Sequence, residues 1–564
     1  MKRILSNLAM AATGAALLAA PAMAAPAATP APFVPTAEMV DKGDVAWMMV
    51  STAFVLMMSV PALALFYGGL VRAKNMLSVL MQVLTIVCVA ALVWFGWGYS
   101  MAFTSTGTPF PTLFGGLDKA FLKGVSVTSL AATFSNGVYL PELVFVMFQM
   151  TFACITPALI VGAFAERVKF TPLIIFVVAW MTLAYFPIAH MVWYWAGPDF
   201  LHAAPTDMGL LWGWGALDFA GGTVVHINAG IAGLIGCLVI GPRIGHGKEP
   251  MPPHSLVMTM IGASLLWIGW FGFNAGSALE SNAFAALAFI NTFVATAAAG
   301  VAWAVIEKVA HGKPSLLGGV SGVVAGLVAI TPAAGFAHPG TAIILGAVAS
   351  LICYFFVTTV KNKLKYDDTL DVFGIHAVGG IVGAIGTGIV ADPALGGQGW
   401  IDYTAPVAKA GEFDLVGQVI TQCWAVGTTV AWTSVVSAGL FLALKYTIGL
   451  RPDAEAETNG LDITEHGERA YNYSGSIAQK VGTGFCPSRC DQQRNTKLGG
   501  GRPLSPSPLP PPHLVPPANE QTDYGRSSES SPAFFCLVMF HVKQSPRPAA
   551  RGGQQESRGG LEGV

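Results

Sequence analysis

The chain is patterned as a series of long apolar runs separated by short polar segments. Runs of about 20 residues, long enough to cross a hydrocarbon layer, begin near residues 45, 76, 140, 172, 219, 255, 283, 315, 338, 373 and 414. This pattern predicts an all-α polytopic membrane protein with about eleven transmembrane helices. Composition agrees, because 53% of the residues are hydrophobic and 11% are charged, whereas soluble domains carry about 25% charged residues. A net charge of −1 gives no basic excess for binding nucleic acid.

Basic residues between the apolar runs predict the orientation of the helices. With an external N-terminus, the internal loops contain Arg72, Lys74, Arg167, Lys169, Arg243, Lys248, Lys308, Lys313, Lys361, Lys363 and Lys365. The longer external loops contain Lys119, Lys123 and Lys409. Because cytoplasmic loops are enriched in Lys and Arg, we expect the N-terminus outside and, after an odd number of spans, the C-terminus in the cytoplasm.

The two ends of the chain differ from its apolar middle. Residues 1–24 contain Lys2 and Arg3, a short apolar stretch and a small-residue motif, which predict a secretory signal peptide, with an uncleaved first span as the alternative. Residues 25–44 would then form an external segment and residues 45–450 the membrane domain. Residues 451–473 would lie in the cytoplasm. Residues 474–564 are rich in Pro, Gly and Ser, which predicts a disordered tail; a frameshift or readthrough is one origin for such a sequence.

Two apolar runs contain a histidine in a similar context. D-F-A-G-G-T-V-V-H (218–226) and D-V-F-G-I-H (371–376) each begin with a carboxylate, continue through glycine and reach His226 or His376. An ionisable residue inside a membrane span is costly and therefore marks a candidate functional site. The simplest interpretation is that the two histidines face each other. The alternative is that each is hydrogen-bonded to a backbone carbonyl in an ordinary helix bundle.

The histidine runs are the fifth and the tenth spans. A unit of five helices that is repeated once must invert its topology, as in many transporters whose site lies at the repeat interface near the midplane. We therefore expect a five-plus-five inverted repeat, with an eleventh span at about 414–447 outside it. Gly318, Gly322 and Gly326, and Gly379 with Gly383, have the four-residue spacing that lets helices pack closely.

A membrane metalloenzyme is a competing hypothesis, in which His226 and His376 would share a metal with Asp218 and Asp371. At 1.5 Å per residue, Asp218 lies about 12 Å from His226 along a helix. That separation disfavours a common metal ion, so the sequence predicts neither a metal site nor a cofactor.

Six motifs together resemble the ammonium transporter family (Amt/MEP/Rh), in its bacterial Amt type. They are A-L-D-F-A-G-G-T-V-V-H-I-N-A (216–229), G-W-F-G-F-N-A-G-S (269–277), G-A-F-A-E-R (162–167), P-I-A-H-M-V-W (187–193), G-K-P-S-L-L-G (312–318) and D-V-F-G-I-H (371–376). The resemblance covers about residues 40–473. It implies an ammonium or ammonia transporter, not an enzyme, with methylammonium as a substrate analogue.

The resemblance implies an external recruitment site for ammonium at Phe148, Phe152, Trp193 and Ser277. Aromatic ring faces attract a cation by about 0.5–2 kcal/mol, and the Ser277 hydroxyl adds an acceptor for one N–H group. An F-x-x-x-F pair alone is more often simple core packing. Asp218 matches an acidic position of the family that would order the mouth and favour a cation, with a helix N-cap role as the alternative.

The resemblance also implies a pore below this site. Phe152 and Phe273 match the stacked pair that blocks the pore mouth, and His226, His376 and Trp270 match residues that line the pore, although Trp270 has core packing as its alternative. Neutral imidazoles can donate and accept hydrogen bonds, so the pair could coordinate ammonia or relay a proton released at the mouth. Transport of ammonia, of ammonium, or of ammonia with a separate proton all fit this arrangement.

One external loop departs from the family pattern. The segment from Tyr194 to Trp214 is longer than in the shorter family members and contains several tryptophans. Trp195, Trp212 and Trp214 therefore compete with Trp193 as the aromatic residue that completes the recruitment site.

The C-terminal segment and the family together suggest partners. G-L-D-I-T-E-H-G-E-R-A-Y (460–471) resembles the cytoplasmic regulatory motif of the family. The resemblance implies a homotrimer in the lipid of the inner (plasma) membrane, with one pore per subunit, and a P-II nitrogen-signalling protein as a candidate partner at the cytoplasmic face. An ammonium sensor that signals through this C-terminus is the alternative function.

Overall fold

The computed structural model describes residues 33–405 and 408–472. The predicted signal peptide at residues 1–24, most of the external segment that precedes residue 33, and the predicted tail at 474–564 lie outside the described residues.

Eleven helical spans are long and apolar enough to cross a membrane in the described part of the chain, and their starts lie within a few residues of those predicted. The first five contain α2 (Lys42–Met57), α3 (Ala64–Leu70), α4 (Met76–Val93), α5 (Tyr99–Phe103), α6 (Glu142–Ile160), α7 (Phe170–Trp180), α8 (Phe186–Trp193) and α10 (Asn228–Ile240). The next five contain α11 (Leu256–Gly276), α12 (Ala283–His311), α13 (Leu316–Ile330), α14 (Pro339–Phe355), α15 (Lys361–Leu364) and α16 (Val378–Val390). The eleventh is α17 (Leu415–Thr447), which confirms the span expected outside the repeat.

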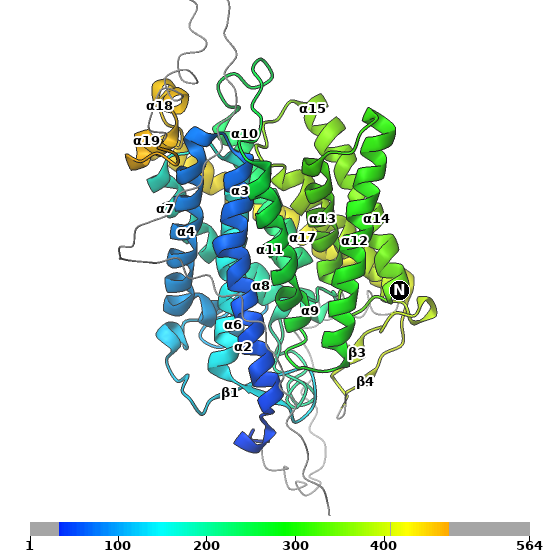
Figure 1. The fold of residues 1–564 in the computed structure, drawn as a ribbon. Coiled ribbons are helices and arrows are strands. Elements are labelled where there is room, and N and C mark those ends of the chain that lie inside the picture. Colours follow the sequence, from blue (N-terminus) through cyan, green and yellow to red (C-terminus); the bar gives the residue numbers. More distant parts are fainter. Residues whose placement is uncertain (1–32, 406–407, 473–564) are drawn as a thin grey trace, which may run out of the picture. The chain divides into compact units, whose positions relative to one another are not determined.

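Short elements mark the two ends of the helical bundle (Figure 1). At one end, here called the strand end, β1 (Leu130–Ala132) pairs antiparallel with β2 (Tyr139–Pro141), and β3 (Ile401–Asp402) pairs antiparallel with β4 (Lys409–Ala410). The short helix α9 (Leu210–Gly213) precedes the fifth span. At the opposite end, here called the C-terminal end, lie α18 (Ala454–Asn459) and α19 (Leu461–His466).

The fifth and tenth spans run antiparallel to each other. The Arg167 side chain donates hydrogen bonds both to the carbonyl of Gly241, just after α10, and to the carbonyl of Asp367, just before the tenth span. The Gln422 amide donates to the carbonyl of Leu217, before the fifth span, and to that of Ala384 within α16. The C-terminal part of each span therefore lies beside the residues that precede the other span, as an inverted repeat requires.

Glycine permits the two antiparallel spans to touch where they cross. A Cβ atom added at Gly230 would lie 2.4 Å from the backbone nitrogen of Ala377, and one at Gly380 would lie 3.0 Å from the carbonyl oxygen of Gly222. The predicted close packing at the G-x-x-x-G sites is also found, since Cβ atoms at Gly322 and Gly326 would collide with α12 at 2.6 and 2.5 Å. Small residues thus let helix backbones approach without intervening side chains.

Candidate functional site

The structure brings His226 and His376 together near the centre of the bundle. Their Nδ1 atoms are 3.3 Å apart, and their nearly parallel rings have centroids 5.4 Å apart. Both side chains are buried, and each lies in a π-helical turn, Gly222–Ile227 or Phe373–Ala377, at the start of its span. Such turns are rare and concentrate at functional sites. A hydrogen bond between two Nδ1 atoms needs one donor and one acceptor, so at least one imidazole is neutral.

A narrow apolar lumen lies beside the histidine pair. Its volume is about 10 Å³, roughly the space that one water molecule needs. The lumen is lined by Met58, Leu63, Phe66, Ile155, Leu159, Val225, His226, Leu266, Trp270, Phe273, Val324 and His376. The Nε2 atom of His226 has no hydrogen-bond partner among the described residues, and it is therefore available to a small polar molecule in the lumen.

Two stacked phenyl rings separate the lumen from the strand end. Phe152 and Phe273 are stacked with centroids 4.3 Å apart, and Phe273 lies 6.0 Å from the His226 ring. Trp270 stacks on the His226 ring at 5.3 Å, while its indole N–H donates to the Thr331 hydroxyl at 2.9 Å. Trp270 thus both lines the lumen and fixes one face of His226.

Above the stacked pair, the predicted recruitment residues form a cluster of rings. The Phe148 and Trp193 rings both meet Phe152 edge-on, at centroid distances of 5.0 and 5.8 Å. Phe148 also lies against Gly276, next to Ser277. The Ser277 hydroxyl donates to the Phe273 carbonyl at 2.8 Å, which leaves the lone pairs of its oxygen free to accept an N–H group.

Two of the three competing tryptophans lie in a different stack. Trp195 and Trp212 stack on each other at 4.8 Å, and both stack on Phe134. Trp214 is 39% exposed. Trp193 is the tryptophan for which a ring contact with Phe152 is found in the described part of the chain, and its indole N–H is fixed by the carbonyl of Asp218 at 3.1 Å.

Asp218 caps the start of the fifth span. Its carboxylate accepts hydrogen bonds from the backbone N–H groups of Gly221, Gly222, Thr223 and Val224, at 2.6–3.1 Å. Of the two roles open from the sequence, this geometry shows the helix cap. The cap holds the turn that carries His226, and its negative charge stabilises the positive end of the helix dipole.

Asp368, just before the tenth span, is the residue equivalent to Asp218. The sequence-based prediction that Asp371 is this equivalent residue is therefore wrong. The Asp368 carboxylate accepts from the backbone N–H groups of Val372 and Phe373. It lies eight positions before His376, as Asp218 lies eight positions before His226. Asp371 instead pairs with Lys361 at 2.6 Å. A comparison of the two spacings would have found Asp368.

A second cavity leads from His376 to the C-terminal end. It has a volume of about 250 Å³, and its lining includes Tyr67, Arg243, Lys361, Asp371 and His376. Phe66, Val324 and His376 line both this cavity and the lumen. The stacked phenyl rings, the lumen, the histidine pair and the larger cavity therefore follow one another through the bundle.

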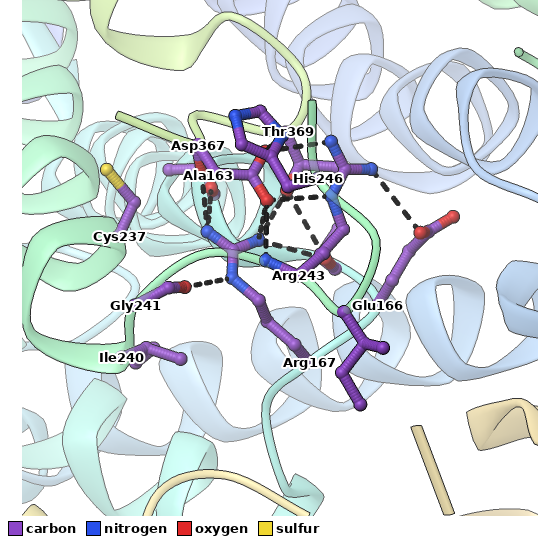
Figure 2. Close-up of polar contacts among 12 residues, drawn as sticks. Ala163, Glu166, Arg167, Cys237, Ile240, Gly241, Arg243, His246, Asp367 and Thr369 are labelled. Atoms are coloured by element: carbon purple, nitrogen blue, oxygen red, sulfur yellow. Dashed lines mark hydrogen bonds and ion pairs between the residues drawn. The ribbon is translucent and has the colours of Figure 1, made fainter. Parts of the chain in front are cut away.

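Buried charges support the wall of the larger cavity (Figure 2). Arg243 donates to both carboxylate oxygens of Asp367 at 2.8–2.9 Å and contacts Glu166 at 3.3 Å, while the buried Arg167 donates to the Thr369 hydroxyl. Burial alone would raise the pKa of Asp367, but the hydrogen bonds and charges of Arg243 and Arg167 hold it well below the usual range. The E-R of the G-A-F-A-E-R motif belongs to this network, a role that the sequence alone does not show.

The C-terminal segment docks on loops at the same end. The backbone N–H of Leu461 donates to the Asn75 side chain, and that of Ser78 donates to Asp462, both at 2.8 Å. Glu457 pairs with Arg451 and accepts from the backbone N–H of Ile244. The segment thus contacts the loop that follows the fifth span, which carries Arg243 of the cavity wall.

Comparison with known proteins places the chain in one family. The model described as Ammonium Transporter Family matches residues 46–471. An ammonium transporter of Aquifex aeolicus (strain VF5) is 46% identical over 437 residues, covering 77% of this chain and 94% of that protein. An ammonium transporter of Bacillus subtilis (strain 168) is 41% identical over 439 residues, covering 77% and 99%.

Solved structures agree on the fold. Saccharomyces cerevisiae Mep2 superposes with a TM-score of 0.64 at 32% identity, over 74% of this chain and 89% of that one. A structure described as Sensor Amt Protein gives a TM-score of 0.66 at 26% identity, over 75% and 98%. The named curated relatives are transporters, not enzymes, so a metalloenzyme is no longer a candidate. With eleven spans and matches over most of its length, the chain is a multi-pass membrane protein that belongs to the ammonium transporter family.

Proposed function

We propose that the protein takes up ammonium at the strand end and conducts ammonia past the histidine pair to the C-terminal end. The observation that carries this proposal is the succession of the ring cluster, the stacked phenyl pair, a lumen of about 10 Å³ and the paired imidazoles. Family membership supports ammonium as the transported substrate.

The ring cluster is suited to holding a small cation. Phe148, Phe152 and Trp193 form a cluster of rings. Phe148 lies against Gly276, next to Ser277, and a desolvated ring face attracts a cation by up to about 2 kcal/mol. Ser277 adds a directional contact, because ammonium donates N–H bonds and K⁺ does not. These residues would therefore select ammonium at the mouth.

The lumen favours the neutral molecule. Moving a bare ion into a dry apolar medium costs on the order of 20 kcal/mol before relaxation. Releasing a proton costs about 1.36 kcal/mol for each unit by which the pKa of ammonium exceeds the ambient pH. Deprotonation at the phenyl pair is therefore the less costly route, and ammonia alone would enter the lumen.

The histidine pair would compensate for the lost hydration of ammonia. A neutral imidazole presents either an N–H donor or a nitrogen acceptor, and the free Nε2 of His226 faces no other partner among the described residues. The hydrogen bond between the two Nδ1 atoms also provides a route by which the released proton would pass from one ring to the other. We propose this relay as the source of any net charge transport.

The orientation and assembly complete the proposal. The excess of Lys and Arg in loops at the C-terminal end supports a cytoplasmic location for that end, and hence an external strand end in the inner (plasma) membrane. We also propose a homotrimer, and regulation by a P-II protein at the larger cavity, on the strength of the family resemblance.

A sensor is the second candidate function. The docking of α18 and α19 on the inner loops gives the C-terminus a direct mechanical connection to the cavity wall, and one similar structure is described as a sensor. A sensor alone would bind ammonium but would give no methylammonium uptake when reconstituted.

The proposal is tested by methylammonium uptake into proteoliposomes that contain equal amounts of wild type, His226→Ala or Ser277→Leu. We expect rapid uptake by wild type, loss of uptake in His226→Ala, and a large reduction in Ser277→Leu because leucine removes the acceptor and fills the site. Equal uptake by all three proteins would refute the proposed pore, and absence of uptake by wild type would favour the sensor.

A further inference from the structure

Glu280 is a buried acid at the strand end, and one of its carboxylate oxygens has no hydrogen-bond partner among the described residues. It follows Ser277 by three residues and is 6% exposed. Its Oε2 atom accepts hydrogen bonds from the Ser135 hydroxyl and the Asn282 amide, both at 2.9 Å. Its Oε1 atom is buried and has no hydrogen-bond partner among the described residues.

Glu280 differs from the other buried glutamates in lacking a cation. Glu142, Glu166 and Glu457 form ion pairs with Lys119, Arg72 and Arg451, respectively. Within residues 33–405 and 408–472, Glu280 is the buried glutamate that takes part in no ion pair. Burying an unpaired carboxylate is costly. A cation bound beside Glu280 would therefore stabilise this site.

The backbone fixes the position of this carboxylate. Leu279 adopts a left-handed conformation with φ of 60°, which a non-glycine residue adopts only at a cost. On the C-terminal side of Glu280, both the backbone N–H and the hydroxyl of Ser281 donate to the Asp44 carboxylate, at 2.7 and 2.9 Å. Asp44 is itself buried, and no ion pair is found for it in the described part of the chain. The left-handed turn at Leu279 and the hydrogen bonds of Ser281 to Asp44 therefore fix the backbone on both sides of Glu280.

Aromatic rings adjoin the same region. Ser135, which donates to Glu280, follows Phe134 of the stack with Trp195 and Trp212. Tyr403 packs on Trp195 with centroids 4.7 Å apart. Burial raises the pKa of Tyr403 first, and the charge of Glu280 raises it further, so the two side chains lie within electrostatic range.

We propose that Glu280 forms an outer cation site that holds one ammonium ion, through an N–H bond to Oε1, before the ion reaches the ring cluster at Ser277. This inference rests on the proposed function. An incoming ammonium ion would then meet a charged site at Glu280 before it reaches the uncharged aromatic site at Ser277. Negative charge in a partly desolvated mouth raises the local concentration of a cationic substrate and so improves capture at low concentration.

The chemistry of the site favours a small monovalent cation over a divalent metal. Oε2 is already occupied by two donors, which leaves one carboxylate oxygen. Ca²⁺ requires six to eight oxygen ligands, and Mg²⁺ requires octahedral coordination. No group of three metal-ligating side chains occurs in the part of the chain that the structure describes.

Uptake kinetics test the inference. Glu280→Gln keeps the shape and the hydrogen-bond acceptor but removes the charge, and the exposed Glu412→Gln is the matched control. We expect the KM for methylammonium to increase about 3- to 10-fold in Glu280→Gln at low ionic strength, with an unchanged maximal rate and a smaller difference at high salt. Glu412→Gln should behave as wild type. An unchanged KM in Glu280→Gln would overturn the inference.

Direct occupancy is tested by rubidium, which resembles ammonium in size and scatters anomalously. Crystals of the full chain soaked in RbCl should show an anomalous peak in contact with Oε1 of Glu280 in wild type and none there in Glu280→Gln. Absence of the peak from wild type would overturn the inference. Because wild-type uptake and its loss in His226→Ala are measured in the same assay, failure of the outer site is distinguishable from failure of the pore.

Discussion

The fifth and tenth spans contain the same parts at the same spacing but face different surroundings. Each has a capping aspartate eight residues before its histidine and a glycine four residues after it. His226, however, is stacked on Trp270 and lies below the phenyl pair, whereas His376 also lines the cavity of about 250 Å³. The repeat therefore sets the geometry of the pair, and the neighbouring helices give one histidine an outer role and the other an inner role.

The caps also differ in strength. Asp218 accepts four backbone N–H bonds, whereas two are found for Asp368. Asp368 has the Lys361–Asp371 ion pair as a neighbour in sequence, while no ion pair is found for Asp218 in the described part of the chain. The outer cap thus rests on four hydrogen bonds, and the inner cap rests on two.

Removal of the caps should show the largest effect. We expect Asp218→Ala to lower the free energy of unfolding by about 2–4 kcal/mol and to abolish uptake, because four N–H groups lose their acceptor and the His226 turn is released. Asp368→Ala should lower it by less, since fewer bonds are lost. Thermal unfolding in detergent and methylammonium uptake measure both effects, and a more severe loss in Asp368→Ala would contradict this ordering.

The crossing glycines offer the next comparison. Gly230→Ala places a Cβ atom 2.4 Å from a backbone nitrogen, whereas Gly380→Ala makes its nearest contact at 3.0 Å. Overpacking costs about 1–3 kcal/mol, and at Gly230 the backbone next to His376 must move. We expect at least about a tenfold lower uptake rate for Gly230→Ala and partial uptake for Gly380→Ala, in proteoliposomes with matched protein content. Equal rates for the two variants would contradict a tighter backbone contact at Gly230 than at Gly380.

The smallest effect concerns pH and is specific to the inner half. Burial raises the pKa of Asp368 to about 7, against the charge of Lys361 and together with that of Asp371. Its unfolded pKa is about 3.9, so between about pH 4 and 7 the folded protein holds a proton that the unfolded chain has released. Stability should therefore fall as the pH rises through this range.

The Asp368→Asn variant cannot titrate and serves as the comparison. Its thermal midpoint should change less than that of wild type between pH 5 and pH 7.5. A parallel change in the two proteins would assign the pH dependence to other groups.

The sequence predicted the spans well because each apolar run is long and nearly free of charge. The family motifs also predicted that Phe152 stacks on Phe273 and that His226 faces His376, and the structure contains both contacts. The motifs did not reveal Asp368, because the acid within D-V-F-G-I-H is Asp371 and Asp368 lies three residues before this motif. The Arg243–Asp367 pairing and the unpaired state of Glu280 could not be predicted, since both depend on which distant loops meet in three dimensions.

The central claim is that the substrate passes through the lumen between the phenyl pair and the histidines. Val324 lines both cavities, whereas Val320, one turn earlier in α13 and similarly buried, lines neither. Methylammonium uptake by Val324→Phe and Val320→Phe, at equal membrane content, tests the claim most directly. Uptake blocked in Val324→Phe and retained in Val320→Phe is the expected result, whereas equal uptake by the two variants would contradict a path through this lumen.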